Sequence, residues 1–174
     1  MNNEKLIIQS PEHLLAQVYA MKCESEDRLQ DLIDSLKQHN NSAAADIFSR
    51  TIELIQNSIK NIEHRAQGMQ LPEIPPWEAQ WYCEEQPDYQ CIENAHYLMT
   101  PLQALELAIF NEKRLQEFFA QQIDTGVNEK IRLIADDFLI QEKQLTKQMH
   151  SWKKQLENNP AEQNEDLDPP NIPE

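Results

Sequence analysis

The sequence predicts an all-α protein that folds as a four-helix bundle. Only 2 glycines occur in 174 residues, and apolar residues recur with helical spacing over four long stretches. Two of these stretches begin with similar capping sequences. With 40% apolar residues, the chain can bury a substantial core as one domain. We expect this domain over residues 10–156, an N-terminal extension over 1–9 and a tail over 157–174.

The first helix is predicted to begin after Ser10 and to run to about Gln38. The Ser10 hydroxyl can cap free backbone NH groups, and Pro11 fits the first turn without losing a hydrogen bond. Lys22 and Ser25 fall in the middle of the apolar stripe of this helix. The stripe consists of Leu15, Val18, Leu29, Leu32 and Leu36.

A second helix is predicted after a short turn at residues 39–42, and it ends near Ala66, before Gly68. Because the turn is short, the first two helices form an antiparallel hairpin. The inward positions of the second helix are Phe48, Ile52, Ile55, Ile59 and Ile62.

Residues 69–99 form a long connection whose prolines forbid a continuous helix. The segment is too long for a tight turn and too rich in aromatic residues for a free linker. We expect an ordered crossover over the bundle, with Trp77 and Trp81 packed against it. Such a crossover lets the next helix run parallel to the second one.

The third helix is predicted to begin with a capping box, in which Gln103 reaches back to the Thr100 NH group. A turn at residues 124–126 leads into a fourth helix over about 128–156. Glu112 and Glu142 lie inside the apolar stripes of these two helices. The other inward positions are Leu105, Ala108, Leu115 and Phe119, then Ile131, Ala135, Phe138, Leu145, Met149, Trp152 and Leu156.

Acidic residues outnumber basic ones by 30 to 15, which gives a net charge of −15. We therefore expect neither nucleic acid nor a membrane among the partners. Residues 157–174 contain six acids and no base, so we expect a disordered, solubilising tail. No apolar run approaches the roughly 20 residues that span a bilayer, and residues 1–5 lack a signal-peptide pattern. These observations predict a cytoplasmic protein.

The three cysteines, Cys23, Cys83 and Cys91, are an odd number without CxxC spacing. Reduced thiols are therefore expected, with ordinary packing as the preferred role of Cys83 and Cys91 and a redox role left open. His64 and its neighbour Glu63 lie off the inward stripe, which predicts a solvated pair rather than a displaced metal site.

The first and third helices are related by an internal repeat. Ser10-Pro11 and Thr100-Pro101 open the two copies in the same register, and twelve positions after each cap stand Lys22 and Glu112. A lysine and a glutamate at equivalent inward positions predict a bundle with a charged centre, because a buried charge is tolerable only when it is paired.

The segment Thr100-Pro-Leu-Gln-Ala-Leu-Glu-Leu-Ala-Ile-Phe-Asn-Glu112, followed by Phe118-Phe119, resembles the third helix of the ferritin-like superfamily in its rubrerythrin-related branch. In that family an inward glutamate of this helix binds iron, and an aromatic residue follows seven positions later. The Pro-Pro-Trp sequence at 75–77 adds to the resemblance, which covers roughly residues 10–156. It implies a ferritin-like, up-down-down-up four-helix bundle with a long ordered crossover between its second and third helices.

In this family a di-iron centre takes one glutamate from each of two helices and an ExxH motif from each of the other two. Carboxylates neutralise and bridge the irons, and imidazoles complete the coordination. The resemblance places Glu112 on the glutamate of the third helix. It places the other ligand positions on Lys22, on Ile55 and Ser58, and on Glu142 and Leu145. The expected site is therefore vestigial, with both histidines absent.

We therefore expect Lys22 to be an internal cation that pairs with Glu112 and with Glu142. One positive charge cannot balance two buried carboxylates, so Glu142 is expected either to be partly hydrated or to hold a proton with a raised pKa. Ser25 and Ser58 are expected to supply hydrogen bonds to this group. Two readings that keep Lys22 out of the centre stay open: the lysine snorkels to the surface, or a shift of two residues places Glu24 inward.

The predicted function is non-enzymatic, that of a scaffold or interaction protein without a cofactor. The resemblance implies a homodimer formed through exposed helix faces, or a protein partner that the sequence does not name. One alternative is a residual oxidoreductase with a single iron or manganese ion at Glu112 and Glu142, helped by Glu24 or Glu53. Another is a small-ligand module that uses the crossover, in a cleft lined by Trp77, Trp81 and Tyr97.

Overall fold

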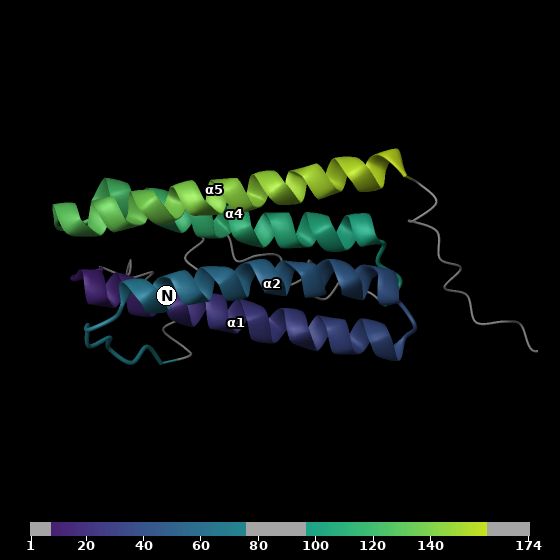
Figure 1. The fold of residues 1–174 in the computed structure, drawn as a ribbon, viewed down its shortest axis with the longest axis horizontal. Helices are drawn as coiled ribbons and strands as arrows, with labels where there is room; N and C mark the ends of the chain where they lie inside the picture. Colours follow the sequence, from purple (N-terminus) through teal and green to yellow (C-terminus); the bar gives the residue numbers. More distant parts are fainter. Residues whose placement is uncertain (1–7, 76–96, 160–174) are drawn as a thin grey trace, which may run out of the picture.

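The computed structural model describes residues 8–75 and 97–159, and in these ranges it contains four helices and no strand. The helices are α1 (Pro11–Gln38), α2 (Ser42–Arg65), α4 (Pro101–Thr125) and α5 (Glu129–Asn158). Helices α1 and α5 run in one direction and α2 and α4 in the other, which gives the up-down-down-up order (Figure 1). The predicted all-α four-helix bundle is thus confirmed.

Side-chain caps define where each helix begins. Ser10, Asn41 and Asn128 each accept a hydrogen bond from the backbone NH group three residues later, at 3.1, 3.2 and 3.0 Å. Thr100 and Gln103 form the predicted capping box, with bonds of 3.2 and 2.9 Å. The starts of all four helices therefore follow from short polar residues placed immediately before apolar stripes.

The bundle consists of two antiparallel hairpins. α1 packs along α2, α4 packs along α5, and α2 also approaches α4 (Figure 1). Four alanines from the first turns of α2 and α4 are buried in the same apolar cluster, where small side chains permit close packing. These alanines are Ala44, Ala45, Ala104 and Ala108.

The apolar core is divided into two clusters along the length of the bundle. One cluster contains the second half of α1, the first half of α2, the start of α4 and the end of α5. The other contains the start of α1, Ile62, the second half of α4 and the first half of α5. Between them lie three buried charged residues, Lys22, Glu112 and Glu142. A layer of charge therefore crosses the middle of the core.

Some sequence predictions concern residues outside the described ranges. Trp77, Trp81, Cys83 and Cys91 are among them, as is most of the acidic tail. Cys23 is a free thiol on α1. Among the described residues, no helix is both long and apolar enough to cross a membrane.

Candidate functional site

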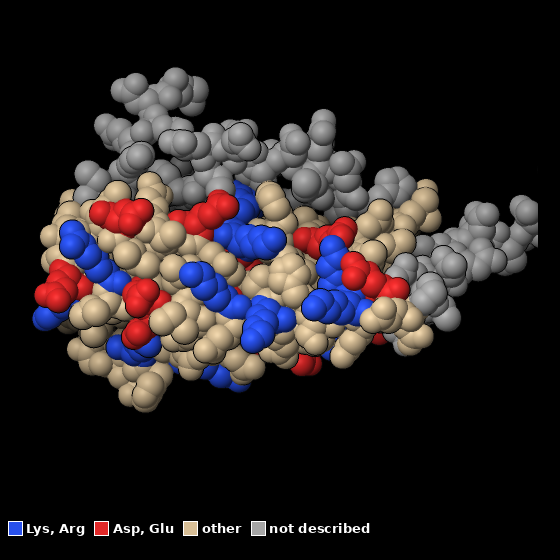
Figure 2. Space-filling view, turned by 90° about the horizontal axis from the view of Figure 1, so that it is seen from above, with Lys and Arg blue, Asp and Glu red and all other residues tan. Residues whose placement is uncertain are grey.

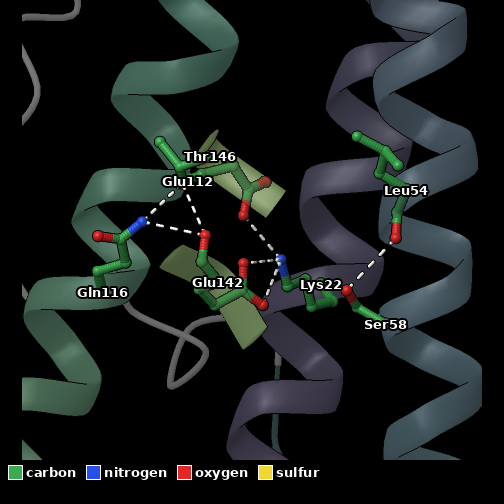
Figure 3. Close-up of polar contacts among 7 residues, drawn as sticks. All are labelled: Lys22, Leu54, Ser58, Glu112, Gln116, Glu142 and Thr146. Atoms are coloured by element: carbon green, nitrogen blue, oxygen red, sulfur yellow. Dashed lines mark hydrogen bonds and ion pairs between the residues drawn. The ribbon is translucent and has the colours of Figure 1, made fainter. Parts of the chain in front are cut away.

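Lys22 lies at the centre of the charged layer, between two glutamates. Its side chain is 1% exposed, and its Nζ atom lies 2.8 Å from Glu112 Oε2 and 3.1 Å from each carboxylate oxygen of Glu142. The glutamates are 3% and 2% exposed. Figure 3 shows the amine directed at both carboxylates, with each residue coming from a different helix. The predicted pairing of Lys22 with Glu112 and Glu142 is present, so neither a snorkelling lysine nor an inward Glu24 describes this layer.

Ile55 and Ser58, the two expected ligand positions of α2, contribute no polar contact to the layer among the hydrogen bonds of the described residues. Ile55 is completely buried and offers no donor or acceptor from its side chain. The predicted hydrogen bond from Ser58 to the charged group is wrong, because the Ser58 hydroxyl donates to the Leu54 carbonyl at 3.3 Å (Figure 3). A serine inside a helix readily makes this bond to the carbonyl four residues before it. Ser25 is buried as predicted.

A second set of polar contacts joins α4 to α5 beside the carboxylates. Gln116 Nε2 donates to Thr146 Oγ1 at 2.6 Å and to the Glu142 carbonyl at 3.2 Å. The Thr146 hydroxyl donates to the same carbonyl at 2.8 Å. Gln116 and Thr146 were not among the predicted site residues, although each stands four residues after one of the two glutamates and therefore on the same helix face. Leu145 is half-buried and packs against the apolar core.

The charges of the layer are set by burial and by proximity. The pKa of Glu142 is raised from 4.5 to about 8, chiefly because the carboxyl is buried and in part because Glu112 lies close, and Lys22 opposes this rise. Burial lowers the pKa of Lys22, but the two carboxylates outweigh it and hold that pKa above its ordinary value. Near neutral pH the amine is therefore charged and Glu142 holds a proton.

The side chains present do not fit a di-iron centre. Lys22 Nζ occupies the space between the two carboxylates at hydrogen-bonding distance, and Ile55 and Leu145 cannot coordinate a metal. Within residues 8–75 and 97–159, no three His, Cys, Asp or Glu side chains converge into a group that could hold a metal ion. What this arrangement can do chemically is neutralise buried carboxylates.

The other candidate ligands lie away from the layer. Glu24 is half-buried and pairs with Arg28 one turn further along α1. Glu53 is exposed on α2. His64 and Glu63 are also exposed, in agreement with the predicted solvated pair. None of these residues reaches the two central glutamates.

Tyr97 is exposed over nearly half of its surface, immediately before α4. Its ring lies 5.0 Å from the His39 ring, centroid to centroid, and its carbonyl accepts a hydrogen bond from Asn41 Nδ2 at 2.9 Å. Asn41 Nδ2 also donates to the Met99 carbonyl at 2.8 Å. The contacts of Tyr97 thus tie the α1–α2 turn to the start of α4.

Comparison with known proteins bears on the fold. No family model and no curated protein matches this sequence. Among solved structures, the chain is similar to an uncharacterized conserved protein from Magnetospirillum magnetotacticum MS-1, with a TM-score of 0.62 and 24% identity. The match covers 84% of this chain and 95% of that one. The chain therefore has the all-α four-helix bundle of the ferritin-like fold, as predicted.

Proposed function

We propose that this protein is a rubrerythrin-related member of the ferritin-like superfamily that works without a di-iron centre, as a scaffold or interaction protein. The observation that carries the proposal is the position of Lys22 Nζ, 2.8 Å from Glu112 and 3.1 Å from Glu142. A fixed ammonium group there supplies the positive charge that buried carboxylates require. A metal ion would compete with it for the same oxygen atoms.

The balance of charge in the layer supports this proposal. A di-iron centre needs several carboxylates to offset two cations, together with imidazole ligands. Here, a single lysine lies between the two glutamates, and the pKa of Glu142, raised to about 8, lets that carboxyl hold a proton near neutral pH. On α2, Ile55 is a buried hydrocarbon side chain within the apolar core. The residues form a consistent set for a core that is neutral without metal.

Incubation with ferrous iron tests the absence of catalysis. The protein is mixed anaerobically with Fe(II) and then exposed to oxygen or to hydrogen peroxide, and the formation of Fe(III) is followed by absorbance. We expect the same rate as for iron in buffer. A faster rate that disappears in both Glu112→Gln and Glu142→Gln would overturn the proposal, whereas a faster rate that survives in both would indicate adventitious iron on the acidic surface.

The residual metalloprotein alternative gains no support from the contacts of its proposed ligands. A single iron or manganese ion at Glu112 and Glu142 would have to displace Lys22. Neither proposed helper is available, because Glu24 pairs with Arg28 and Glu53 is exposed. The ligand module built on Trp77 and Trp81 stays a prediction.

An exposed face of α5 supports the proposed interaction role. Leu133 and Ile140 are 61% and 48% exposed and lie seven residues apart, hence on one side of the helix. Figure 2 shows Lys and Arg side chains interspersed with Asp and Glu on the face seen there. A face of mixed charge suits contact with another protein more than contact with a polyanion. A homodimer is the simplest such partner, and light scattering during size-exclusion chromatography tests it: a monomer at all concentrations would exclude it.

A further inference from the structure

A cavity of about 210 Å³ lies between the middle of α1 and the middle of α4. Three leucines contribute its apolar surface: Leu29 and Leu107 are buried, and Leu32 is half-buried. The space exists because α1 packs mainly on α2, and α4 on α5 and α2, so α1 and α4 approach each other little. No motif in the sequence had singled out this cavity.

Most of the polar side chains that line the cavity offer hydrogen-bond donors, and Ser25 and the carboxylate of Asp31 line it as well. Arg28 from α1 and Arg114 from α4 both line it, together with the amide of Asn111. Arg114 is only 7% exposed, and its guanidinium lies 6.0 Å from the centroid of the Phe110 ring. Guanidinium and amide NH groups are hydrogen-bond donors, and a guanidinium matches the two oxygens of a carboxylate. Acidic residues outnumber basic ones in this chain, whose net charge is −15, so two arginines that line one cavity stand out from its overall composition.

We propose that this cavity binds a small monocarboxylic acid with an apolar body. The carboxylate is held by Arg114 and Arg28, with help from Asn111, and the apolar body lies on the leucines. This inference goes beyond the proposed function and does not depend on it, because no residue of the central ion pair is required for binding.

The volume sets the size of the ligand. A dry cavity of about 150 Å³ holds benzene, so about 210 Å³ accommodates a single ring or a short branched chain together with a carboxylate. Most drug-sized ligands need pockets larger than about 300 Å³ and are therefore excluded.

The charge sets the class of the anion. Asp31 also lines the cavity, so its lining carries two positive charges and one negative charge. Arg28 is in addition partly neutralised by Glu24. Little positive charge is therefore left over, so a phosphate or a dicarboxylate would place a second, uncompensated negative charge near Asp31.

Titration with sodium benzoate and sodium hexanoate, followed by ¹H–¹⁵N NMR, tests the proposal on the full chain. We expect saturable shifts centred on the amides of residues 25–32 and 107–114. Benzyl alcohol and inorganic phosphate serve as controls for the carboxylate and for the single charge. Both should bind at least about tenfold more weakly, since a charge-assisted hydrogen bond corresponds to about that factor in affinity.

Three variants separate this cavity from unspecific binding. Arg28→Gln removes a charge at an exposed position and should weaken benzoate binding about tenfold. Leu32→Trp, at a half-buried position, should fill the cavity and abolish binding. Lys147→Gln removes the same charge from the exposed face of α5 and should change nothing.

Several outcomes would overturn the proposal. One is the absence of saturable binding of either carboxylate by the wild type, and another is equal binding of benzyl alcohol or phosphate. Unchanged binding in a folded Leu32→Trp variant would place the ligand elsewhere, and far-ultraviolet circular dichroism establishes that each variant is folded. Metal content, measured on the same samples, reports separately on the proposed function.

Discussion

Lys22 is a long cationic side chain inside a hydrocarbon core, and its burial would cost several kcal/mol without partners. Its Nζ atom contacts three carboxylate oxygen atoms at 2.8–3.1 Å, which offsets that cost. The arrangement is stable only as a set, because each partner compensates the others. Removing one member should therefore cost more than removing all of them.

Substitution of Lys22 tests this dependence. Lys22→Met keeps the length of the side chain but leaves Glu112 without its cation, so we expect a loss of about 3–5 kcal/mol in the free energy of unfolding. The triple variant that also carries Glu112→Gln and Glu142→Gln should recover part of this loss. Urea denaturation measures the free energy of unfolding of the single and the triple variant. Lys60→Met, on the exposed side of α2, is the matched control. A Lys22→Met variant as stable as the control would contradict the paired core.

The pH dependence of stability tests the proton on Glu142. Its pKa is about 8 in the folded protein against an ordinary 4.5, so between these values the folded state binds more protons than the unfolded state. The free energy of unfolding should therefore fall as the pH rises from about 4.5 to about 8.

The variant Glu142→Gln isolates this effect from the titration of other groups. It should show a weaker decline of the urea midpoint than the wild type over the same pH window. Parallel profiles for the two proteins would mean that Glu142 is already ionised at neutral pH.

At the level of elements, Gln116 and Thr146 connect α4 to α5 through the carbonyl of Glu142. We expect Gln116→Ala and Thr146→Val each to destabilise the protein by about 1 kcal/mol. Both residues act in one network, so the double variant should lose less free energy of unfolding than the two single variants lose together. The expected coupling energy is about 0.5 kcal/mol or more. Strict additivity would show that the two side chains act independently.

Asn41 joins two parts of the chain at one end of the bundle. It is 1% exposed, caps α2 with its oxygen and donates to the carbonyls of Tyr97 and Met99 with its nitrogen. Asn41→Ala should cost about 2 kcal/mol or more, since a cap and buried hydrogen bonds are lost together. Asn41→Ser keeps a capping oxygen, so its melting temperature should lie between those of the wild type and Asn41→Ala. Equal melting temperatures for both variants would show that the bridge to Tyr97 and Met99 contributes most of the effect.

The helices and the central ion pair could be predicted because their signals are local and periodic. Ser10, Thr100 and Asn128 mark helix starts, and helical spacing alone turns Lys22 and Glu112 inward. The bond of Ser58 was predicted wrongly, because a buried hydroxyl can use either a distant partner or its own helix backbone. The cavity could not be predicted, since it depends on how far apart α1 and α4 lie rather than on any motif.

At the scale of the whole molecule, the charged layer divides the apolar core into two clusters. Each cluster receives residues from both hairpins, so the hairpins are held together on both sides of the layer. The apolar contacts that join the hairpins are therefore separate from the charged groups at the centre, since a fold and the chemistry of its site need not depend on each other.

Metal content distinguishes an ammonium group from a metal ion at the centre of the bundle. The protein is expressed without a tag in medium that contains iron and manganese, and both metals are measured by plasma mass spectrometry in the wild type, in Lys22→Glu and in Lys22→Met. We predict well below one metal ion per chain in the wild type and in Lys22→Met, and more in Lys22→Glu, where a third carboxylate replaces the cation. Near-stoichiometric iron or manganese in the wild type would contradict the proposal that Lys22 takes the place of a metal ion between Glu112 and Glu142.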